Sequence, residues 1–556
     1  MKNQRGTRKI FYLFVLIVTL SLSATADERM GKVDKLFVEW DSTVSPGVSM
    51  AIIHNGEIIY KRGYGMANLE HDVPNTPEIV FRIGSTSKQF TAACIAILSL
   101  QGKLSLDDDI RKHLPELPAY DKPITVRHLV HHISGIRDYL GLARLSGKSG
   151  DDFYTAEETV AMIARQRGLN FVPGDEFLYS NSGYFLLGVI VSRASGKSLN
   201  AFAREHIFKP LGMKNTHYHD DYRKIVKKRA DGHAKTEDGF KILNTTLNHV
   251  GDGGVFTTVE DLYIWDQAFY NNKLGKELMD LLHQTGVLNN GEKLEYAFGL
   301  NVGEYKGLKL VAHGGAFVGF RADMIRFPEE KFTVICLANL ASINPSMLCR
   351  QVADIYLADK FTEEKVPEKK AETITPVTLA QEELKNKVGK YTDKKEYFIA
   401  DILLKEDKLI VEARGMSFSL IPISKSKFIS KDAPVEIEIE FFPGDDEAMR
   451  AKMIVGGDRE IPLNKIPAVA PLTPEQLKAY AGSYYNDELP ATYVLVIEQG
   501  KLRFKQRNAP EEPLKLFDKD KFLSDYGKME FTRGRGKKIT GFYLDAGRVR
   551  IQFTKK

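Results

Sequence analysis

The C-terminal part of the chain contains an internal repeat, and this repeat restricts the fold more than any other feature of the sequence. LKNKVGKYTD begins at Leu384 and LKAYAGSYYN at Leu477, and Lys408 and Lys501, each followed by leucine, are the same 93 residues apart. Short runs such as KLIVEAR and KLRFKQ alternate apolar and polar residues, which is typical of antiparallel strands with one buried face. The repeat therefore predicts two copies of one small β domain, each long enough for a meander or barrel.

Strand patterns also lie at both ends of the region before the repeat. GVSMAIIHNGEIIYKRGYG predicts a hairpin that turns at Asn55-Gly56, and strand patterns return in LKLVAHGGAFVGFRADMIRF and KFTVICLAN. From Ser85 to about Leu282 the pattern is mainly helical. We therefore expect one α/β unit in which early and late strands share a sheet. The charged, proline-containing stretch FTEEKVPEKKAETITPVT predicts a linker between this unit and the repeat.

The N-terminus has the order of a secretory signal peptide. An apolar run, IFYLFVLIVTLSLSA, follows the basic residues Lys2, Arg5, Arg8 and Lys9 and precedes Ala24-Thr25-Ala26. The run is short for a membrane span, and an uncleaved anchor is the alternative. We expect removal of residues 1-26 and a periplasmic or extracellular protein.

Charge and cysteine content exclude two classes of protein. The formal net charge is +5, but the first 26 residues carry four positive charges and no negative ones, so the remainder is close to neutral. A nearly neutral protein gives no case for nucleic-acid binding. The three cysteines, Cys94, Cys336 and Cys349, are too few and odd in number for a disulfide scaffold. A bond between Cys336 and Cys349 stays open.

The stretch RIGSTSKQFTA, which begins at Arg82, has two interpretations. Thr86 and Gln89 fit the capping pattern of a helix N-terminus, which would leave Ser85 in a turn and Lys88 in solvent. Alternatively, Ser85 and Lys88 lie one helical turn apart, where the lysine could take the serine proton. The spacing alone does not decide, because Ser424 and Lys427 match the same Ser-x-x-Lys pattern.

Two further short motifs follow. Tyr179-x-Asn181 lies in PGDEFLYSNSGYFLLG, before an apolar run, and by itself predicts no more than a turn. His313-Gly314-Gly315 lies within strand-like sequence, where glycines weaken a strand. These glycines are explained if another segment approaches the strand backbone closely, and a bulge is the alternative.

Taken in order, Ser-x-x-Lys, Tyr-x-Asn and His-Gly-Gly resemble the penicillin-recognising serine hydrolases, in particular the branch of class C β-lactamases, D-Ala-D-Ala carboxypeptidases, D-aminopeptidases and related esterases. The flanks FRIGSTSKQFTA, ITVRHLVHHISGIRDY, PGDEFLYSNSGYFLLG, GDGGVFTTVEDLYIW and AHGGAFVGF match as well, over about Trp40 to Leu357. D-aminopeptidases of this group also carry two C-terminal β-barrel domains.

The resemblance implies an α/β fold: a β-lactamase-like catalytic domain, with an antiparallel sheet flanked by helices plus a helical region, and two small lipocalin-like β-barrels. The expected segments are a signal peptide at 1-26, the serine hydrolase domain at 27-360, a linker at 361-378, and β-barrel domains at 379-470 and 471-556.

The resemblance also implies roles for individual residues. Ser85 is the nucleophile, and Lys88 and Tyr179 are the bases that activate it, with the first proton acceptor left open. The backbone N–H groups of Ser85 and Ala316 form the oxyanion hole. Substrate binding falls to Asn181, His313, Gly314 and Gly315. We expect no cofactor and no metal; His217, His219 and Asp220 have metal-ligand side chains but follow a stretch that is structural in the relatives.

One departure from the family bears on the substrate. β-Lactamases of this branch carry Lys-Thr-Gly where this chain has His313-Gly314-Gly315, and a histidine near neutral pH offers only a partial charge to a substrate carboxylate. This counts against efficient β-lactam hydrolysis.

The sequence thus predicts an exported serine hydrolase that cleaves an amide or ester bond through a Ser85 acyl-enzyme. The expected substrates are small peptides with D-residues or cell-wall fragments. The alternatives are a small-ester hydrolase and a non-catalytic penicillin-binding-like receptor. Association with the cell wall and the oligomeric state stay open.

Overall fold

The structure is a computed structural model. It describes residues 28–148, 152–362, 376–393, 399–413, 416–430, 433, 437–444, 448–455, 459–467, 469–506, 509 and 513–556. The chain divides into two compact units, and each is described by itself. Unit 1 contains Met1–Leu140 and Ser149–Glu364, and unit 2 contains Gly141–Lys148 and Lys365–Lys556. The predicted signal peptide lies outside the described residues, and the exact domain boundaries stay predictions.

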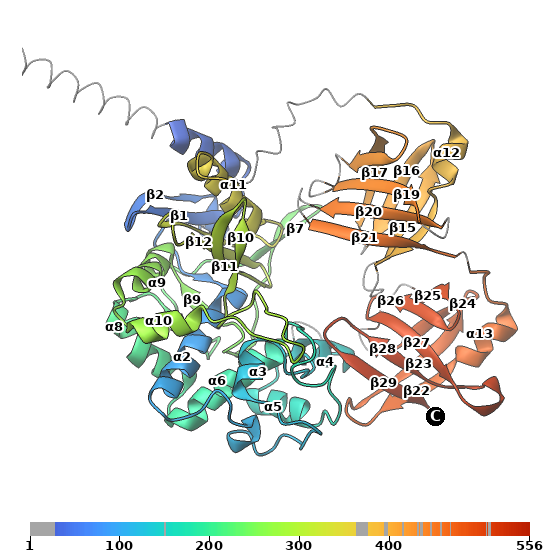
Figure 1. The fold of residues 1–556 in the computed structure, drawn as a ribbon, viewed down its shortest axis with the longest axis horizontal. Coiled ribbons are helices and arrows are strands. Elements are labelled where there is room, and N and C mark those ends of the chain that lie inside the picture. The colour runs from blue at the N-terminus through green and yellow to red at the C-terminus, as the bar shows by residue number, and fades with distance from the viewer. Residues whose placement is uncertain are drawn as a thin grey trace, which may run out of the picture. The chain divides into compact units, whose positions relative to one another are not determined.

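Unit 1 is built around one antiparallel sheet with strands from both ends of the region, as the sequence predicts. Its order is β10-β11-β12-β13-β1-β2, and Figure 1 shows the early strands β1 and β2 beside the late ones. Asn55 and Gly56, with φ of 53° and 85°, turn the β1–β2 hairpin as expected. The strands are β1 (Val48–His54), β2 (Glu57–Tyr64), β10 (Asn301–Tyr305), β11 (Leu308–Phe317), β12 (Phe320–Phe327) and β13 (Phe332–Ala338).

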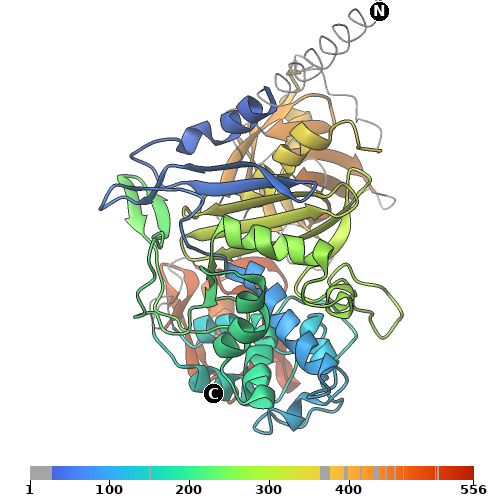
Figure 2. The same ribbon diagram turned by 90° about the vertical axis from the view of Figure 1, so that its left-hand side faces the viewer.

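Helices cover both faces of this sheet, so its central strands are largely buried. All seven residues of β13 are buried. On one face, α11 (Pro345–Leu357) packs against β12 and β13, and helical residues 28–37 add Val33 and Phe37 to the same core. On the other face, α9 (Val259–Asn271) packs against β1 and β13 (Figure 2). Cys94, Cys336 and Cys349 are buried free thiols.

The segment between the two groups of strands forms a mainly helical region. Local sequence sets several helix ends: Thr155 and Glu158 form a capping box at α5, and Gly196, at φ 71°, ends α6. The elements are η2 (Gly84–Ser87), α2 (Lys88–Leu100), α3 (Val126–Val130), α4 (Tyr139–Leu145), α5 (Ala156–Ala164), α6 (Asn181–Ser195), α7 (Leu199–Ala203), α8 (Lys209–Leu211) and α10 (Lys276–Leu282), with a small sheet of β5 (Phe81–Arg82), β9 (Val255–Thr257) and β6 (His217–Tyr218).

The first repeat in unit 2 is a closed antiparallel barrel. Along β16, Leu409, Val411 and Ala413 point into its core, while the residues between them are more exposed. Its strands are β14 (Gly389–Thr392), β15 (Ile399–Lys405), β16 (Lys408–Ala413), β17 (Met416–Pro422), β18 (Lys427–Ser430), β19 (Ile437–Pro443), β20 (Met449–Val455) and β21 (Arg459–Ile466).

The second repeat is an eight-stranded sheet with the same strand succession, in which the described residues show no pairing between β24 and β25. Equivalent tyrosines form the same hydrogen bond in both copies. Tyr391 and Tyr484, 93 residues apart, each donate a hydroxyl hydrogen bond to the carbonyl four residues earlier. The strands are β22 (Gly482–Asn486), β23 (Ala491–Glu498), β24 (Lys501–Lys505), β25 (Lys515–Asp518), β26 (Lys521–Ser524), β27 (Gly527–Arg533), β28 (Ile539–Asp545) and β29 (Arg550–Lys555). The prediction of two β-barrel domains is confirmed.

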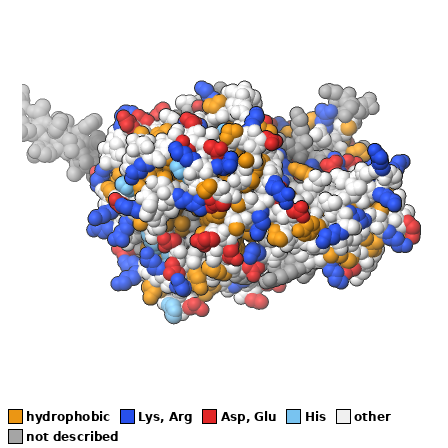
Figure 3. All heavy atoms as spheres, turned by 90° about the horizontal axis from the view of Figure 1, so that it is seen from below, with side chains coloured by type: hydrophobic (Ala, Val, Ile, Leu, Met, Phe, Trp, Pro, Cys, Tyr) orange, Lys and Arg blue, Asp and Glu red, His pale blue; other side chains and the backbone are white. Residues whose placement is uncertain are grey.

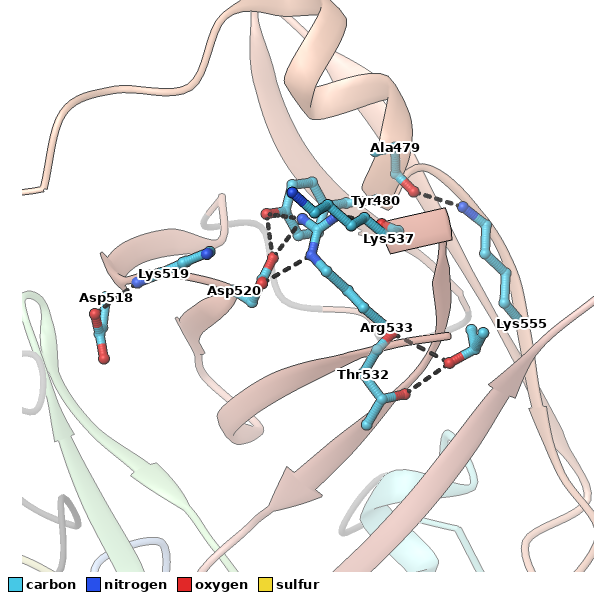
Figure 4. A network of polar contacts seen from close by, with 10 residues as sticks. Ala479, Tyr480, Asp518, Lys519, Asp520, Thr532, Arg533, Lys537 and Lys555 are labelled. Carbon is cyan, nitrogen blue, oxygen red and sulfur yellow. Dashed lines mark hydrogen bonds and ion pairs between the residues drawn. The ribbon is translucent and has the colours of Figure 1, made fainter. Parts of the chain in front are cut away.

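Polar contacts close one end of the second repeat. Arg533 donates to Asp520 at 2.6 Å, and the Tyr480 hydroxyl donates to the same carboxylate at 2.6 Å (Figure 4). Lys555 donates to the carbonyl of Ala479 at 2.7 Å. These contacts fasten α13 (Pro474–Tyr480) to the strands that follow it in the chain.

Helix α4 belongs to unit 2 from Gly141 onward, although its sequence lies between elements of unit 1. The hydroxyl of Tyr493 in β23 donates to the carbonyl of Leu145 at 2.8 Å. A side chain at position 141 would lie 2.7 Å from Val549, so glycine permits this packing. Within unit 2, α4 and the second repeat therefore form one core.

Among the described residues, no helix is long and apolar enough to cross a membrane. On the face shown in Figure 3, basic and acidic side chains are interspersed, in keeping with the low net charge of the sequence.

A buried ion pair gives a test of the packing of unit 1. Asp266 in α9 accepts hydrogen bonds from Arg326 Nε at 2.7 Å and from the Thr333 hydroxyl at 2.9 Å, and the Asp266 and Arg326 side chains are 1% and 3% exposed. Asp266→Ala leaves the arginine charge buried and unpaired, so we expect a loss of about 3–5 kcal/mol in unfolding free energy. Urea unfolding followed by tryptophan fluorescence measures this, because both tryptophans of the chain, Trp40 and Trp265, lie in unit 1.

The matched control is Asp280→Ala, which removes an exposed ion pair with Lys276 on a neighbouring helix. An exposed pair contributes at most about 1 kcal/mol. Equal shifts in the two variants would contradict the role of the buried pair.

Candidate active site

Ser85 and Lys88 lie where the sequence motif suggests, at the entrance to α2. Lys88 Nζ is 3.2 Å from Ser85 Oγ. Ser85 is partly exposed, while every other residue from Phe81 to Phe90 is buried. The capping alternative is wrong: Thr86 donates its hydroxyl hydrogen bond to the carbonyl of His313, and Gln89 bonds to Trp265. Ser85 is thus the most accessible residue at the start of this helix.

The Lys88 ammonium group is fully buried and has three hydrogen-bond acceptors. Besides Ser85 Oγ, these are Asn181 Oδ1 at 2.9 Å and the carbonyl oxygen of Asp252 at 2.5 Å. An ammonium group has three N–H donors, so this arrangement satisfies a charged lysine completely.

Asp252 is a member of the site that sequence reasoning missed. Its carboxyl group is buried and accepts a hydrogen bond from the Tyr139 hydroxyl at 3.0 Å. Burial raises the pKa of this carboxyl group, and the nearby Lys88 charge acts in the opposite direction. Gly251 and Gly254, both at positive φ, give the loop its shape. The glycine-rich stretch GDGGVF was the available signal for this loop.

Asn181 is the first residue of α6, and a neighbouring loop fixes it. Its backbone N–H donates to Asp138 Oδ2 at 2.7 Å. The Ser182 hydroxyl accepts from the Tyr139 N–H at 2.7 Å and donates to the Arg137 carbonyl at 2.7 Å. These contacts hold the Asn181 side chain against Lys88.

Tyr179 lies against the lysine with its ring. Lys88 Nζ is 4.8 Å from the Tyr179 ring centroid, and the His132 ring centroid is 4.2 Å from that of Tyr179. His132 Nδ1 accepts from the Ser180 N–H at 3.2 Å, so His132 braces this loop. The structure therefore brings Ser85, Lys88, Tyr179 and Asn181 together.

The glycines at positions 84 and 315 allow strand β11 to approach the segment that carries Ser85. A Cβ at Gly315 would lie 1.9 Å from the carbonyl oxygen of Ile83, and one at Gly84 would lie 2.8 Å from the amide nitrogen of Ala316. The expectation that another segment approaches the His-Gly-Gly backbone is therefore met, and the segment is the one that carries Ser85. Position 314 is less crowded: the atom nearest to a Cβ placed there, Ser346 Oγ, would lie 3.4 Å away.

His313 is buried, and both of its ring nitrogens have partners. Nδ1 lies 2.7 Å from the Gly314 carbonyl and therefore donates to it, which leaves Nε2 to accept from the Tyr296 hydroxyl at 3.0 Å. Burial, together with the Lys88 charge, lowers the pKa of His313 to about 4. The expectation of a partial charge at neutral pH is therefore corrected: this histidine is neutral. Its role in substrate binding stays a prediction.

The second Ser-x-x-Lys motif forms a turn. Ser424 accepts the Lys427 N–H within a turn, and Lys427 Nζ faces Glu438 and Glu440. His217 Nε2 and His219 Nδ1 lie 3.3 Å apart. In the described part of the chain, no three His, Cys, Asp or Glu side chains are grouped so that they could hold a metal ion.

Comparisons with known proteins agree with this site. The sequence profile of the Beta-lactamase family matches residues 24–353. Penicillin-binding protein 4* of Bacillus subtilis (strain 168) is 29% identical over 429 residues, which cover 73% of this chain and 92% of that protein. A D-aminopeptidase of Gluconobacter oxydans (strain 621H) is 29% identical over 297 residues, which cover 53% of this chain and 56% of the relative. The match therefore spans just over half the length of that enzyme.

A solved structure supports the same assignment. The octameric penicillin-binding protein homologue from Pyrococcus abyssi matches with a TM-score of 0.55 and 27% sequence identity, over 78% of this chain and 100% of that chain. With the family profile over more than half of the chain, these findings give one answer. The chain belongs to the Beta-lactamase family and is a serine hydrolase of the penicillin-recognising superfamily.

Proposed function

We propose that the protein hydrolyses amides and small peptides of D-amino acids through an acyl-enzyme on Ser85. The similarity to the D-aminopeptidase of Gluconobacter oxydans supports the substrate class. The observation that carries the chemistry is the 3.2 Å contact between the buried Lys88 Nζ and the partly exposed Ser85 Oγ.

In the proposed reaction, Ser85 Oγ attacks the carbonyl carbon of the scissile amide. The carbonyl oxygen becomes negatively charged and is stabilised by the N–H groups of Ser85 and Ala316. The serine proton passes through the basic group to the leaving amine, the C–N bond breaks, and an ester to Ser85 remains. A water molecule then attacks the ester, gives up a proton to the same base, and releases the acid and free Ser85.

The hydrogen bonds of Lys88 favour Tyr179 as the group that accepts the serine proton. An ammonium group at Lys88 would donate its three N–H bonds to these three partners and would have no lone pair for the serine proton. The lysine charge then stabilises the serine and tyrosine oxygens as they become negative. Asn181, fixed by Asp138, orients both Lys88 and the substrate amide.

Replacing the nucleophile tests the assignment most simply. Ser85→Ala removes the reacting oxygen, so we expect no measurable hydrolysis of D-aminoacyl p-nitroanilides and no labelling by a fluorophosphonate. Ser424→Ala is the matched control, because it lies in the second Ser-x-x-Lys motif, and it should retain full activity. Full activity of Ser85→Ala would refute the mechanism.

Replacing the two basic groups tests whether they act together. Lys88→Met and Tyr179→Phe should each lower kcat/KM at least about a hundredfold. The double variant should lose much less than the product of the single losses, because the two groups serve one proton transfer. Lys427→Met serves as control, and strictly multiplicative losses would show independent roles.

The neutral His313 predicts weak activity on β-lactams. A β-lactamase with lysine at this place presents a fixed charge to the substrate carboxylate, and His313 does not. We expect slow acylation by a fluorescent penicillin and poor turnover of cephalosporins. A kcat/KM near the diffusional ceiling of about 10⁸ M⁻¹s⁻¹ would contradict this interpretation.

We also propose export, on the evidence of the N-terminal sequence. The intact mass of the protein purified from the periplasm or medium of an expressing bacterium should correspond to a chain that begins at Asp27. A full-length chain retained in the membrane would instead indicate an uncleaved anchor. Association with the cell wall stays a prediction of the sequence.

A further inference from the structure

A cavity with cationic walls lies within unit 1, and Arg82, three residues before Ser85, is part of its lining. It has a volume of about 360 Å³, and none of the residues that line it, all of them described, is an aspartate or glutamate. We call it the cationic cavity; its lining includes Arg82, His219, Arg229, Asn244, Phe256 and Phe320.

The cationic cavity is joined to both segments that carry the proposed oxyanion donors. Arg82 ends β5, three residues before Ser85, and pairs with Phe256 in β9. The Arg82 guanidinium group lies 4.8 Å from the ring centroid of Phe317, the residue after Ala316. Arg82 thus links the cavity lining to both segments, through its place before Ser85 and its contact with Phe317.

Arg82 is a buried cation without an ion-pair partner in the described part of the chain. Its side chain is 5% exposed, and its Nε atom is buried with no hydrogen-bond acceptor. Burial lowers the pKa of Arg82 to about 10, which leaves the group charged at neutral pH. The carboxyl group of Asp252, which accepts a hydrogen bond from Tyr139, acts on Arg82 electrostatically, but the described contacts include no ion pair between the two.

Burying the Arg82 charge costs free energy when no anion is bound, and a bound anion offsets that cost. A buried charge needs a partner of opposite charge and acceptors for its N–H groups. The Arg82 guanidinium group lies near the rings of Phe256 and Phe317, at 5.8 and 4.8 Å from their centroids. A planar guanidinium group matches the two oxygens of a carboxylate in geometry and charge.

His219 adds a second unpartnered polar atom to the wall. It is 4% exposed, and its Nε2 is buried without a hydrogen-bond partner in the described residues. Burial and the neighbouring His217 and Arg82 lower the pKa of His219 to about 4, so it is neutral at pH 7. When His217 donates to His219 Nδ1, the His219 proton lies on Nε2, where it can be donated to a ligand. Arg229, which is exposed, adds positive charge at the edge.

We propose that the cationic cavity is a subsite for a carboxylate of the substrate, bound by Arg82 with support from Arg229. The inference rests on the proposed function, because it places the carboxylate near a bond that Ser85 cleaves. The carboxylate belongs either to the acyl part of the substrate or to its leaving group. The enzyme therefore prefers amides and peptides that carry a free carboxylate close to the scissile bond.

The first experiment tests the subsite without relying on hydrolysis. A neutral fluorophosphonate labels Ser85, and the labelling rate is measured with added glutarate or with glutaramide, its uncharged analogue. In the unaltered protein, glutarate should slow labelling and glutaramide should not. The effect should be lost in Arg82→Met and weakened in Arg229→Gln.

The second experiment tests the preference in catalysis and separates the two positions of the carboxylate. The acyl position is tested with D-glutamyl against D-glutaminyl p-nitroanilide, and the leaving-group position with D-alanyl-D-alanine against D-alanyl-D-alaninamide. In one of the pairs, kcat/KM for the carboxylate substrate should be at least about tenfold higher, and Arg82→Met should abolish that ratio.

Lys228→Gln is the matched control, because it removes one positive charge next to Arg229 but does not line the cavity. Arg229→Gln keeps the test valid if Arg82→Met fails to fold, because position 229 is exposed. If no amide is cleaved but glutarate still protects Ser85, the proposed function fails and the subsite stands. If amides are cleaved with no preference in either pair and glutarate gives no protection, the subsite is refuted.

Discussion

The buried ammonium group of Lys88 is the interaction on which the rest of the site depends. A charge in the interior is tolerated when acceptors surround it, and here the acceptors come from three separate segments: Ser85 before α2, Asn181 at the start of α6 and Asp252 in the loop before β9. Each segment must fold correctly for the charge to be satisfied. The hydrogen bonds that fix Ser85 therefore also hold the helical region together around it.

A second constraint is the close contact between β11 and the Ser85 segment. Gly84 and Gly315 leave no room for a side chain at either position, and Thr86 bonds across to the His313 carbonyl. The sheet, covered by α9 and α11, fixes β11, and α2 fixes Ser85. The contact thus places the Ala316 amide beside the segment that carries Ser85.

Sequence reasoning reached the features that depend on local spacing and order. Asn55-Gly56 predicts its turn from backbone chemistry alone, and the 93-residue repeat predicts the two barrels because identical landmarks imply identical strands. Ser85 and Lys88 were singled out by their one-turn spacing together with the order of the later motifs, and the structure brings their side chains within 3.2 Å. At Ser424 and Lys427, which have the same spacing, the lysine Nζ is directed toward two glutamates instead.

What the sequence did not predict depends on contacts between distant segments. Asp252 contacts Lys88 through its backbone carbonyl oxygen. Every residue type has such an oxygen, so the sequence does not indicate this contact. His313 is neutral because the fold buries it beside a lysine, which a motif does not reveal. Arg82 lies in the quoted motif itself, yet its lack of an acidic partner among the described residues follows from which side chains surround it in three dimensions.

The central claim is that Ser85 attacks while Lys88 stays bound to its other partners and the Ala316 amide receives the oxyanion. A crystal structure of the protein after reaction with a phosphonate tests this directly. The account predicts a bond from phosphorus to Ser85 Oγ, a phosphonyl oxygen about 3 Å from the amide nitrogens of Ser85 and Ala316, and Lys88 still bonded to Asn181 and Asp252. Phosphorus on another side chain, or a phosphonyl oxygen that points to solvent with Lys88 withdrawn, would contradict it.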